Sequence, residues 1–209
     1  MKRIICFGDS NTFGYIPGEG GRYDENIRWT SRLGNMLPAY EIVECGLNGR
    51  TTVFDDEKSP LRNGSKALGE ILRQYDPADM FIIMLGTNDC KKKFAANEDM
   101  ITGGLDIIIS QIRLYNSDTY ILIIAPPFIS ESVSKGNMSC EFDAGSAAVS
   151  RLLRDKYKML AEKTGCGFIS MCDYVNADET DGVHMNESSH ERFADIVFEY
   201  ISKNGYSDV

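Results

Sequence analysis

The chain has 209 residues, 43% of them hydrophobic and 25% charged, and its formal net charge at pH 7 is −9. This length suits one domain with a full hydrophobic core, so we expect a single domain over residues 1–209. The acidic balance argues against nucleic-acid binding, which needs clustered Lys and Arg, and against docking on anionic membranes. The one basic run, Lys91-Lys92-Lys93, is most simply a solvated loop or the first turn of a helix.

No segment for export or for crossing a membrane is visible. The apolar run after Lys2 and Arg3 covers only residues 4–7, whereas a signal peptide needs roughly 7–15 apolar residues. No stretch approaches the ~18 apolar residues of a membrane-spanning helix. We therefore expect a cytoplasmic protein.

The six cysteines, at positions 6, 45, 90, 140, 166 and 172, are irregularly spaced and contain no Cys-x-x-Cys pair. Without an export signal, they are expected to be reduced and mostly buried thiols. With two histidines and no paired-ligand spacing, we expect no zinc site, no other metal and no cofactor.

Predicted strands and helices alternate along the chain. Runs rich in Ile, Val and Phe indicate strands, and apolar residues recurring every three or four positions indicate helices. In chain order we predict strand 3–7, helix 28–37, strand 40–45, helix 64–75, strand 80–85, helix 101–112, strand 120–125, helix 149–160, strand 167–171 and a last helix through 193–201, with Asn186 as its N-cap. Most strand runs are apolar at consecutive positions, which is typical of strands covered on both faces. The pattern predicts an α/β fold, a three-layer α/β/α sandwich around a parallel sheet.

The segment 128–144 departs from this alternation. It follows Pro126-Pro127, is rich in Ser, Gly and Asn, and has no clear period. Loops of this length are often functional lids, although an irregular surface excursion fits the sequence equally well.

Four polar segments stand out. Residues 8–11 (GDSN), 49–52 (GRTT) and 86–89 (GTND) each come just after one of the first three predicted strands, and residues 181–184 (DGVH) precede the last helix. Open parallel sheets bind ligands at the carboxyl ends of their strands. The first three segments are therefore expected to meet at one edge of the sheet.

Ser10 and His184 are the residue types of a nucleophile and its general base. A serine hydroxyl is a weak nucleophile until a base accepts its proton. Asp181, three residues before His184, can reach the far ring nitrogen and hold the imidazole in the required tautomer. The other histidine, His190, falls on the apolar stripe of the last helix, so we expect it to be structural.

Acyl transfer also needs hydrogen-bond donors for the developing oxyanion. Gly49 and Ser10 can offer backbone N–H groups, and Asn88 can offer its side-chain amide. Asp9 is assigned to organising the turn rather than to acting as a base. Each segment alone is weak evidence, since GDSN and GTND could be simple turns and DGVH a loop, but the joint occurrence of the four segments in this order favours an acyl-transfer site.

These four segments resemble the signature blocks of the SGNH hydrolases, also called the GDSL esterase/lipase family. The resemblance implies a flavodoxin-like, five-stranded parallel sheet in the order 2-1-3-4-5. It also implies a triad of Ser10, Asp181 and His184, with Ser10, Gly49 and Asn88 forming the oxyanion hole.

A narrower similarity points to the arylesterase/acyltransferase branch of that family. It rests on Arg28-Trp29-Thr30 and on residues 46–52 and 83–89. Trp29 itself is expected to pack between helix and site rather than to form a sugar platform. Relatives in this branch form oligomers, so a homo-oligomer is a possible state of this chain.

The expected function is that of a serine esterase that hydrolyses or transfers short acyl groups of small-molecule esters. Short acyl groups are favoured because no long apolar stretch flanks the four segments, and residues 128–144 are rich in Ser, Gly and charge. The alternatives are a carbohydrate O-deacetylase, or a lysophospholipase or thioesterase of the same fold. A phosphate-binding module at residues 8–14 is disfavoured, because no Gly-x-Gly-x-x-Gly or Walker pattern follows a strand.

Overall fold

Five short apolar runs form one parallel sheet in the computed structural model, which describes residues 1–58 and 60–205. The strands are β1 (Lys2–Gly8), β2 (Tyr40–Gly46), β3 (Met80–Met84), β4 (Tyr120–Ala125) and β5 (Gly167–Ser170). They lie in the order β2-β1-β3-β4-β5, and each neighbouring pair is parallel. The predicted α/β class and strand order are therefore confirmed.

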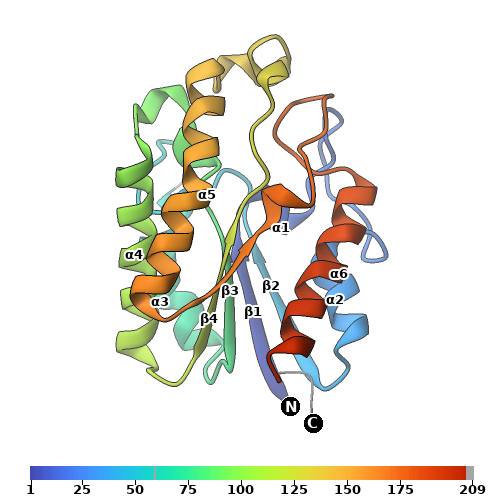
Figure 1. The fold of residues 1–209 in the computed structure, drawn as a ribbon, viewed down its shortest axis with the longest axis vertical. Coiled ribbons are helices and arrows are strands. Elements are labelled where there is room, and N and C mark those ends of the chain that lie inside the picture. The colour runs from blue at the N-terminus through green and yellow to red at the C-terminus, as the bar shows by residue number, and fades with distance from the viewer. Residues whose placement is uncertain (59, 206–209) are drawn as a thin grey trace.

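Helices cover both faces of the sheet, as Figure 1 shows. On one face lie α3 (Gly64–Gln74), α4 (Glu98–Tyr115) and α5 (Ala144–Thr164), and on the other lie α2 (Trp29–Met36) and α6 (Glu187–Lys203). The short helix α1 (Ser10–Phe13) follows β1 directly at its carboxyl end. The longer helices α4 and α5 begin three to five residues before their predicted starts, because Asn97 and Asp143 cap them.

Two hydrophobic clusters explain why the strands are apolar at consecutive positions. Ile5 and Phe7 pack with the helices of the α3–α5 face, whereas Ile4 and Cys6 pack with Trp29 on the α2–α6 face. Successive side chains of a strand point to opposite faces, so a sheet covered on both sides buries every residue of its central strands. The core thereby holds the carboxyl ends of β1, β2 and β3 in place.

Helix α6 begins where the sequence predicted. The Asn186 side chain accepts a hydrogen bond from the Ser189 backbone N–H and donates one to Asp178 Oδ2 at 2.9 Å. This cap fixes the turn that immediately precedes the helix and that carries His184.

Segment 128–144 contains two short 3₁₀ helices, η4 (Glu131–Ser134) and η5 (Asn137–Cys140), before α5 begins. It runs beyond the carboxyl ends of the strands, at the top of the molecule in Figure 1.

No helix among the described residues has the length and apolar character needed to cross a membrane. The cysteines are free, and Cys140 is the exposed one.

Candidate active site

The four polar segments meet at the carboxyl edge of the sheet. Gly8 pairs with Gly46 on β2 and with Met84 on β3, so the residues that follow these strands start from the same level. Ser10, Gly49, Asn88 and His184 line one cavity of about 240 Å³. A larger groove of about 450 Å³ lies over β5 between α5 and α6, and none of these four residues lines it.

Ser10, His184 and Asp181 form one continuous hydrogen-bonded chain. His184 Nε2 lies 2.9 Å from Ser10 Oγ, and His184 Nδ1 lies 2.7 Å from Asp181 Oδ2. A carboxylate only accepts hydrogen bonds, so Nδ1 carries the proton and Nε2 is left as the acceptor that faces the serine. This is the tautomer that a general base needs.

The turn around Asp181 favours its ionised form. Asp181 Oδ1 accepts the backbone N–H groups of Val183 and His184, each at 2.9 Å. Burial opposes ionisation of this carboxyl, but the side-chain hydrogen bond from His184, the positive charge of that ring when it is protonated and these backbone hydrogen bonds outweigh burial and lower the pKa of Asp181 to about 2. Asp181 is therefore a carboxylate throughout the neutral pH range.

Local backbone chemistry places Ser10 at the start of α1. The Asp9 side chain accepts the Asn11 backbone N–H at 2.9 Å and so caps the helix, as the sequence predicted for Asp9. Helix α1 lies so close to β2 that a Cβ at Gly46 would be 2.2 Å from the Phe13 nitrogen. Only glycine permits this approach.

Gly49 and Asn88 lie beside Ser10 as the candidate oxyanion donors. Gly49 has φ +82°, a conformation that glycine adopts without strain. Asn88 Nδ2 donates to the Arg50 carbonyl at 3.1 Å and lies 3.4 Å from Asp9 Oδ2. These contacts fix the orientation of the amide before a substrate arrives.

A buried carboxylate that sequence analysis did not single out joins the second and third segments. Asp89 accepts the Thr52 backbone N–H at 2.9 Å and also the Thr52 hydroxyl. Burial raises the pKa of Asp89 to about 7 and that of Asp9 to about 6, and the charge of Asp9 contributes to the first of these shifts. The only sequence signal for Asp89 was its place directly after Asn88.

Asn11 and Arg50 are two further supports that sequence reasoning missed. Asn11 Oδ1 accepts the Met185 backbone N–H at 2.9 Å and Asn11 Nδ2 donates to the Val183 carbonyl at 3.2 Å, which ties α1 to the turn of His184. Arg50 is buried, and its Nη1 donates to the Gly8 carbonyl at 2.9 Å. Both residues join segments that are far apart in the sequence.

Residues 14–28 cover the triad from one side. The Tyr15 ring packs against His184 with 4.3 Å between ring centroids and a tilt of 38° between the ring planes, and the Gly18 N–H donates to Asp181 Oδ2 at 3.3 Å. Both contacts reach the imidazole–carboxylate pair, so this loop restrains the triad and limits its contact with water.

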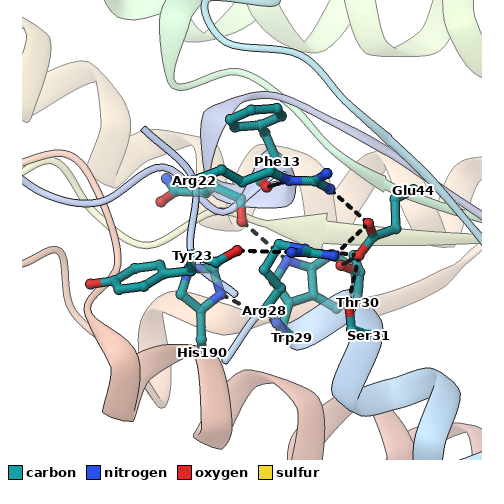
Figure 2. Close-up of polar contacts among 10 residues, drawn as sticks. Phe13, Arg22, Tyr23, Arg28, Trp29, Thr30, Ser31, Glu44 and His190 are labelled. Atoms are coloured by element: carbon teal, nitrogen blue, oxygen red, sulfur yellow. Dashed lines mark hydrogen bonds and ion pairs between the residues drawn. The ribbon is translucent and has the colours of Figure 1, made fainter. Parts of the chain in front are cut away.

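A polar cluster holds this loop against the sheet; we call it the Glu44 cluster. Figure 2 shows its members converging on the Glu44 carboxylate: Arg22, Arg28, Thr30 and Ser31. Burial disfavours the Glu44 charge, but the hydrogen bonds from Thr30 and Arg28 outweigh it and lower its pKa. The block Arg28-Trp29-Thr30 thus serves to anchor the loop.

Trp29 and His190 pack behind the site, as the sequence predicted for both. Trp29 is 1% exposed, and its Nε1–H donates to the Asn11 carbonyl at 3.2 Å. His190 is fully buried, accepts the Trp29 backbone N–H on Nδ1 at 3.4 Å, and meets the Tyr23 ring edge-on (Figure 2). Burial, aided by the charges of Arg28 and Arg32, lowers the pKa of His190 to about 3, so it is neutral.

The expectation of a solvated loop or a first helical turn is wrong for Lys91. Its side chain is 5% exposed, and its ammonium lies 2.6 Å from Glu141 Oε2. A buried ammonium needs an anionic partner, and Glu141 provides one from segment 128–144. The short 3₁₀ turn η3 (Lys92–Phe94) follows.

Among the residues that the structure describes, no group of three or more His, Cys, Asp or Glu side chains is arranged to hold a metal ion.

The model of the GDSL-like lipase/acylhydrolase family matches residues 6–192 of the chain. Among solved structures, Est24, a carbohydrate acetylesterase from Sinorhizobium meliloti, is 29% identical with a TM-score of 0.89, over 98% of this chain and 100% of that one. The native aryl esterase of M. smegmatis is 29% identical with a TM-score of 0.88, over 97% and 99% of the two chains. A member of the lipolytic protein G-D-S-L family from Veillonella parvula DSM 2008 shares the fold at 19% identity, with a TM-score of 0.71 over 97% and 100%. No curated protein matches the chain.

Proposed function

The chain belongs to the GDSL-like lipase/acylhydrolase family and is a hydrolase that acts on esters, and on this premise we propose that it is a serine esterase for short acyl groups of small-molecule esters. The observation that carries the proposal is the hydrogen-bonded chain Ser10–His184–Asp181 at the wall of the cavity. Gly49 and Asn88 line the same cavity on the oxyanion side.

In the acylation step, Ser10 Oγ attacks the ester carbonyl while His184 Nε2 accepts the hydroxyl proton. Asp181 stabilises the imidazolium that forms. The Ser10 and Gly49 N–H groups and Asn88 Nδ2 hold the negative charge of the tetrahedral oxygen. His184 then returns its proton to the leaving alcohol, and an acyl-serine remains.

In the deacylation step, water or a second alcohol attacks the acyl-serine while His184 again accepts a proton. The tetrahedral intermediate collapses, Ser10 regains its proton from His184, and the acid or the new ester departs. The 2.9 Å and 2.7 Å contacts along the triad support proton transfer through His184 without rearrangement.

The cavity supports a small acyl group. Its volume is about 240 Å³, and most of the residues that line it are polar or charged. Each buried methylene contributes only about 0.8 kcal/mol, so a lipase needs a wide apolar groove. We therefore assign acetyl to butyryl esters to this site. A carbohydrate acetylesterase is the second candidate, because a structure of that description is 29% identical over 98% of this chain.

Covalent labelling tests the nucleophile. A fluorophosphonate should add one phosphonyl group to the wild-type protein and none to Ser10→Ala, as read by intact mass. Ser188→Ala is the matched control, because Ser188 is exposed on α6 and lies outside the cavity. Equal labelling of Ser10→Ala and wild type, or wild-type turnover of p-nitrophenyl acetate by Ser10→Ala, would remove Ser10 from the mechanism.

A further inference from the structure

Three cationic side chains line the cavity of Ser10 and His184, and this feature indicates the charge of the substrate. We propose that the esters processed here carry a carboxylate, which is recognised by the cationic wall, defined as Lys58, Arg62 and Lys91. The proposal rests on the function proposed above and adds a substrate class to it.

Lys91 is the member least accessible to solvent. Its side chain is 5% exposed, its ammonium is 2.6 Å from Glu141 Oε2, and it lies 5.6 Å from the centre of the Phe142 ring. Burying an ammonium costs free energy unless an anionic partner compensates for the lost hydration. Lys91 also follows the oxyanion residue Asn88 by only three positions and lines the same cavity, which places this charge close to the reacting centre.

Arg62 brings a second charge to the oxyanion hole itself. A Cβ added at Gly49 would lie 2.7 Å from both Cζ and Nε of Arg62, so the guanidinium packs directly on this glycine. One Arg62 nitrogen is paired with Asp56 Oδ2 at 2.8 Å. Guanidinium presents its donors as a planar fork that matches carboxylate geometry.

The carboxylates of this wall do not balance its cations. Glu141 is shared by Lys91 and Lys58, and Asp56 is shared by Arg62 and Lys93. Lys93 does not line the cavity, so the three cations of the wall against these two carboxylates leave a net charge of +1. This surplus faces the cavity of a chain whose overall charge is −9, so it is a local feature of the site.

The carboxylate that pairs with Lys58 and Lys91 belongs to Glu141, in segment 128–144. Glu141 Oε1 lies 3.1 Å from the Lys58 ammonium, and Glu141 also lines the cavity. A substrate carboxylate would approach the same ammonium groups that Glu141 now contacts. Glu141 and the substrate carboxylate therefore compete for these ammonium groups. Loss of the Lys91 charge should weaken binding of the substrate carboxylate, whereas loss of the Glu141 charge should strengthen it.

Two matched pairs of esters place the charge on either side of the ester bond. The first pair is 4-acetoxybenzoate and the neutral 4-acetoxybenzamide. The second is monophenyl glutarate and its neutral primary amide. For each pair, kcat/KM divided by the rate of hydroxide hydrolysis gives a charge preference. We expect the wild-type protein to prefer the carboxylate member of at least one pair by about tenfold or more, which corresponds to about 1.4 kcal/mol.

Variants then test the wall itself. Lys91→Gln should lower the charge preference by about tenfold, whereas Glu141→Gln should raise it, because the competing anion is gone. Lys92→Gln is the matched control: it removes a neighbouring charge that is exposed and outside the cavity, so the preference should stay as in wild type. If the pair served only to hold segment 128–144, both variants would shift activity in the same direction and leave the preference unchanged.

The proposal is overturned if wild type prefers the neutral member of both pairs, or if Lys91→Gln and Glu141→Gln move the preference the same way. Should Lys91→Gln fail to fold, Glu141→Gln still decides, because a preference that does not rise contradicts competition. Failure of the serine mechanism is distinguishable: Ser10→Ala would then hydrolyse the neutral esters as wild type does.

Discussion

Replacing His190 with glutamine removes a titrating group from the core without touching the cavity. His190 is fully buried, and burial lowers its pKa to about 3 from an ordinary value of 6.5. The folded state therefore favours the neutral ring. The contribution of neutral His190 to the free energy of unfolding is complete above pH 6.5. It is lost as the pH falls toward 3, because the histidine of the unfolded chain binds a proton at a higher pH than His190 of the folded chain. One proton gives a slope of about 1.4 kcal/mol per pH unit.

Between pH 6.5 and 4 the wild-type protein should lose about 3 kcal/mol of unfolding free energy through this group. His190→Gln should lack that loss, while every carboxylate contributes equally to both proteins. Urea unfolding at several pH values, followed by the fluorescence of Trp29, the only tryptophan, measures the difference. Parallel curves of unfolding free energy against pH would refute a neutral, buried His190. His190→Gln should also keep its esterase activity at pH 8, whereas His184→Gln should lose it.

Four further outcomes are expected. Asn88→Ala should lower kcat by about 10²–10³ with a smaller effect on KM, because the amide serves charge that arises in the transition state; a loss confined to KM contradicts this role. Asp89→Asn should gain stability relative to wild type as the pH rises from 4 to 7, because burial raises the folded-state pKa of Asp89 to about 7 and only the unfolded chain ionises this carboxyl in that window; urea titrations with no relative gain refute it. Glu44→Gln should cost about 2 kcal/mol, or about 4–8 °C in Tm, and should lower kcat by freeing the loop of Tyr15. Glu41→Gln, on the same strand but in a partly exposed pair with Arg3, is its control and should be nearly neutral in both measurements. Finally, kcat/KM across p-nitrophenyl esters should peak between acetyl and butyryl, and a steady rise to dodecanoyl would favour a lysophospholipase or thioesterase.

The sheet and its helices were predictable because their causes are local. The run Ile4 to Phe7 is apolar at four consecutive positions, and a strand buried on both faces needs this pattern. The start of α6 was predictable for the same reason, since Asn186 caps it through its own side chain. The grouping of Ser10, Gly49 and Asn88 in one cavity followed from topology, because parallel neighbouring strands end at one edge.

The supports of the site could not be predicted from local patterns, because their partners lie far along the chain. Asn11 meets Met185 across 174 positions, and Thr52 meets Asp89 across 37. Nothing in the sequence around Glu44 indicates that two arginines from the preceding loop converge on it. Such contacts depend on the folded arrangement of several segments, and a polar residue beside a strand is equally compatible with solvent exposure.

Lys91 is a further residue whose surroundings could not be predicted from the local sequence. Three consecutive lysines are normally a solvated surface, and Lys92 follows that expectation. Lys91 is buried only because Glu141, 50 positions later, supplies a carboxylate 2.6 Å away. An ion pair in so confined a place adds little stability compared with apolar residues of similar size, since desolvation of both charges offsets their attraction. A charge kept at that cost in the cavity that Ser10 also lines is better explained by a ligand of opposite charge than by stability, which is why the cationic wall bears on substrate choice.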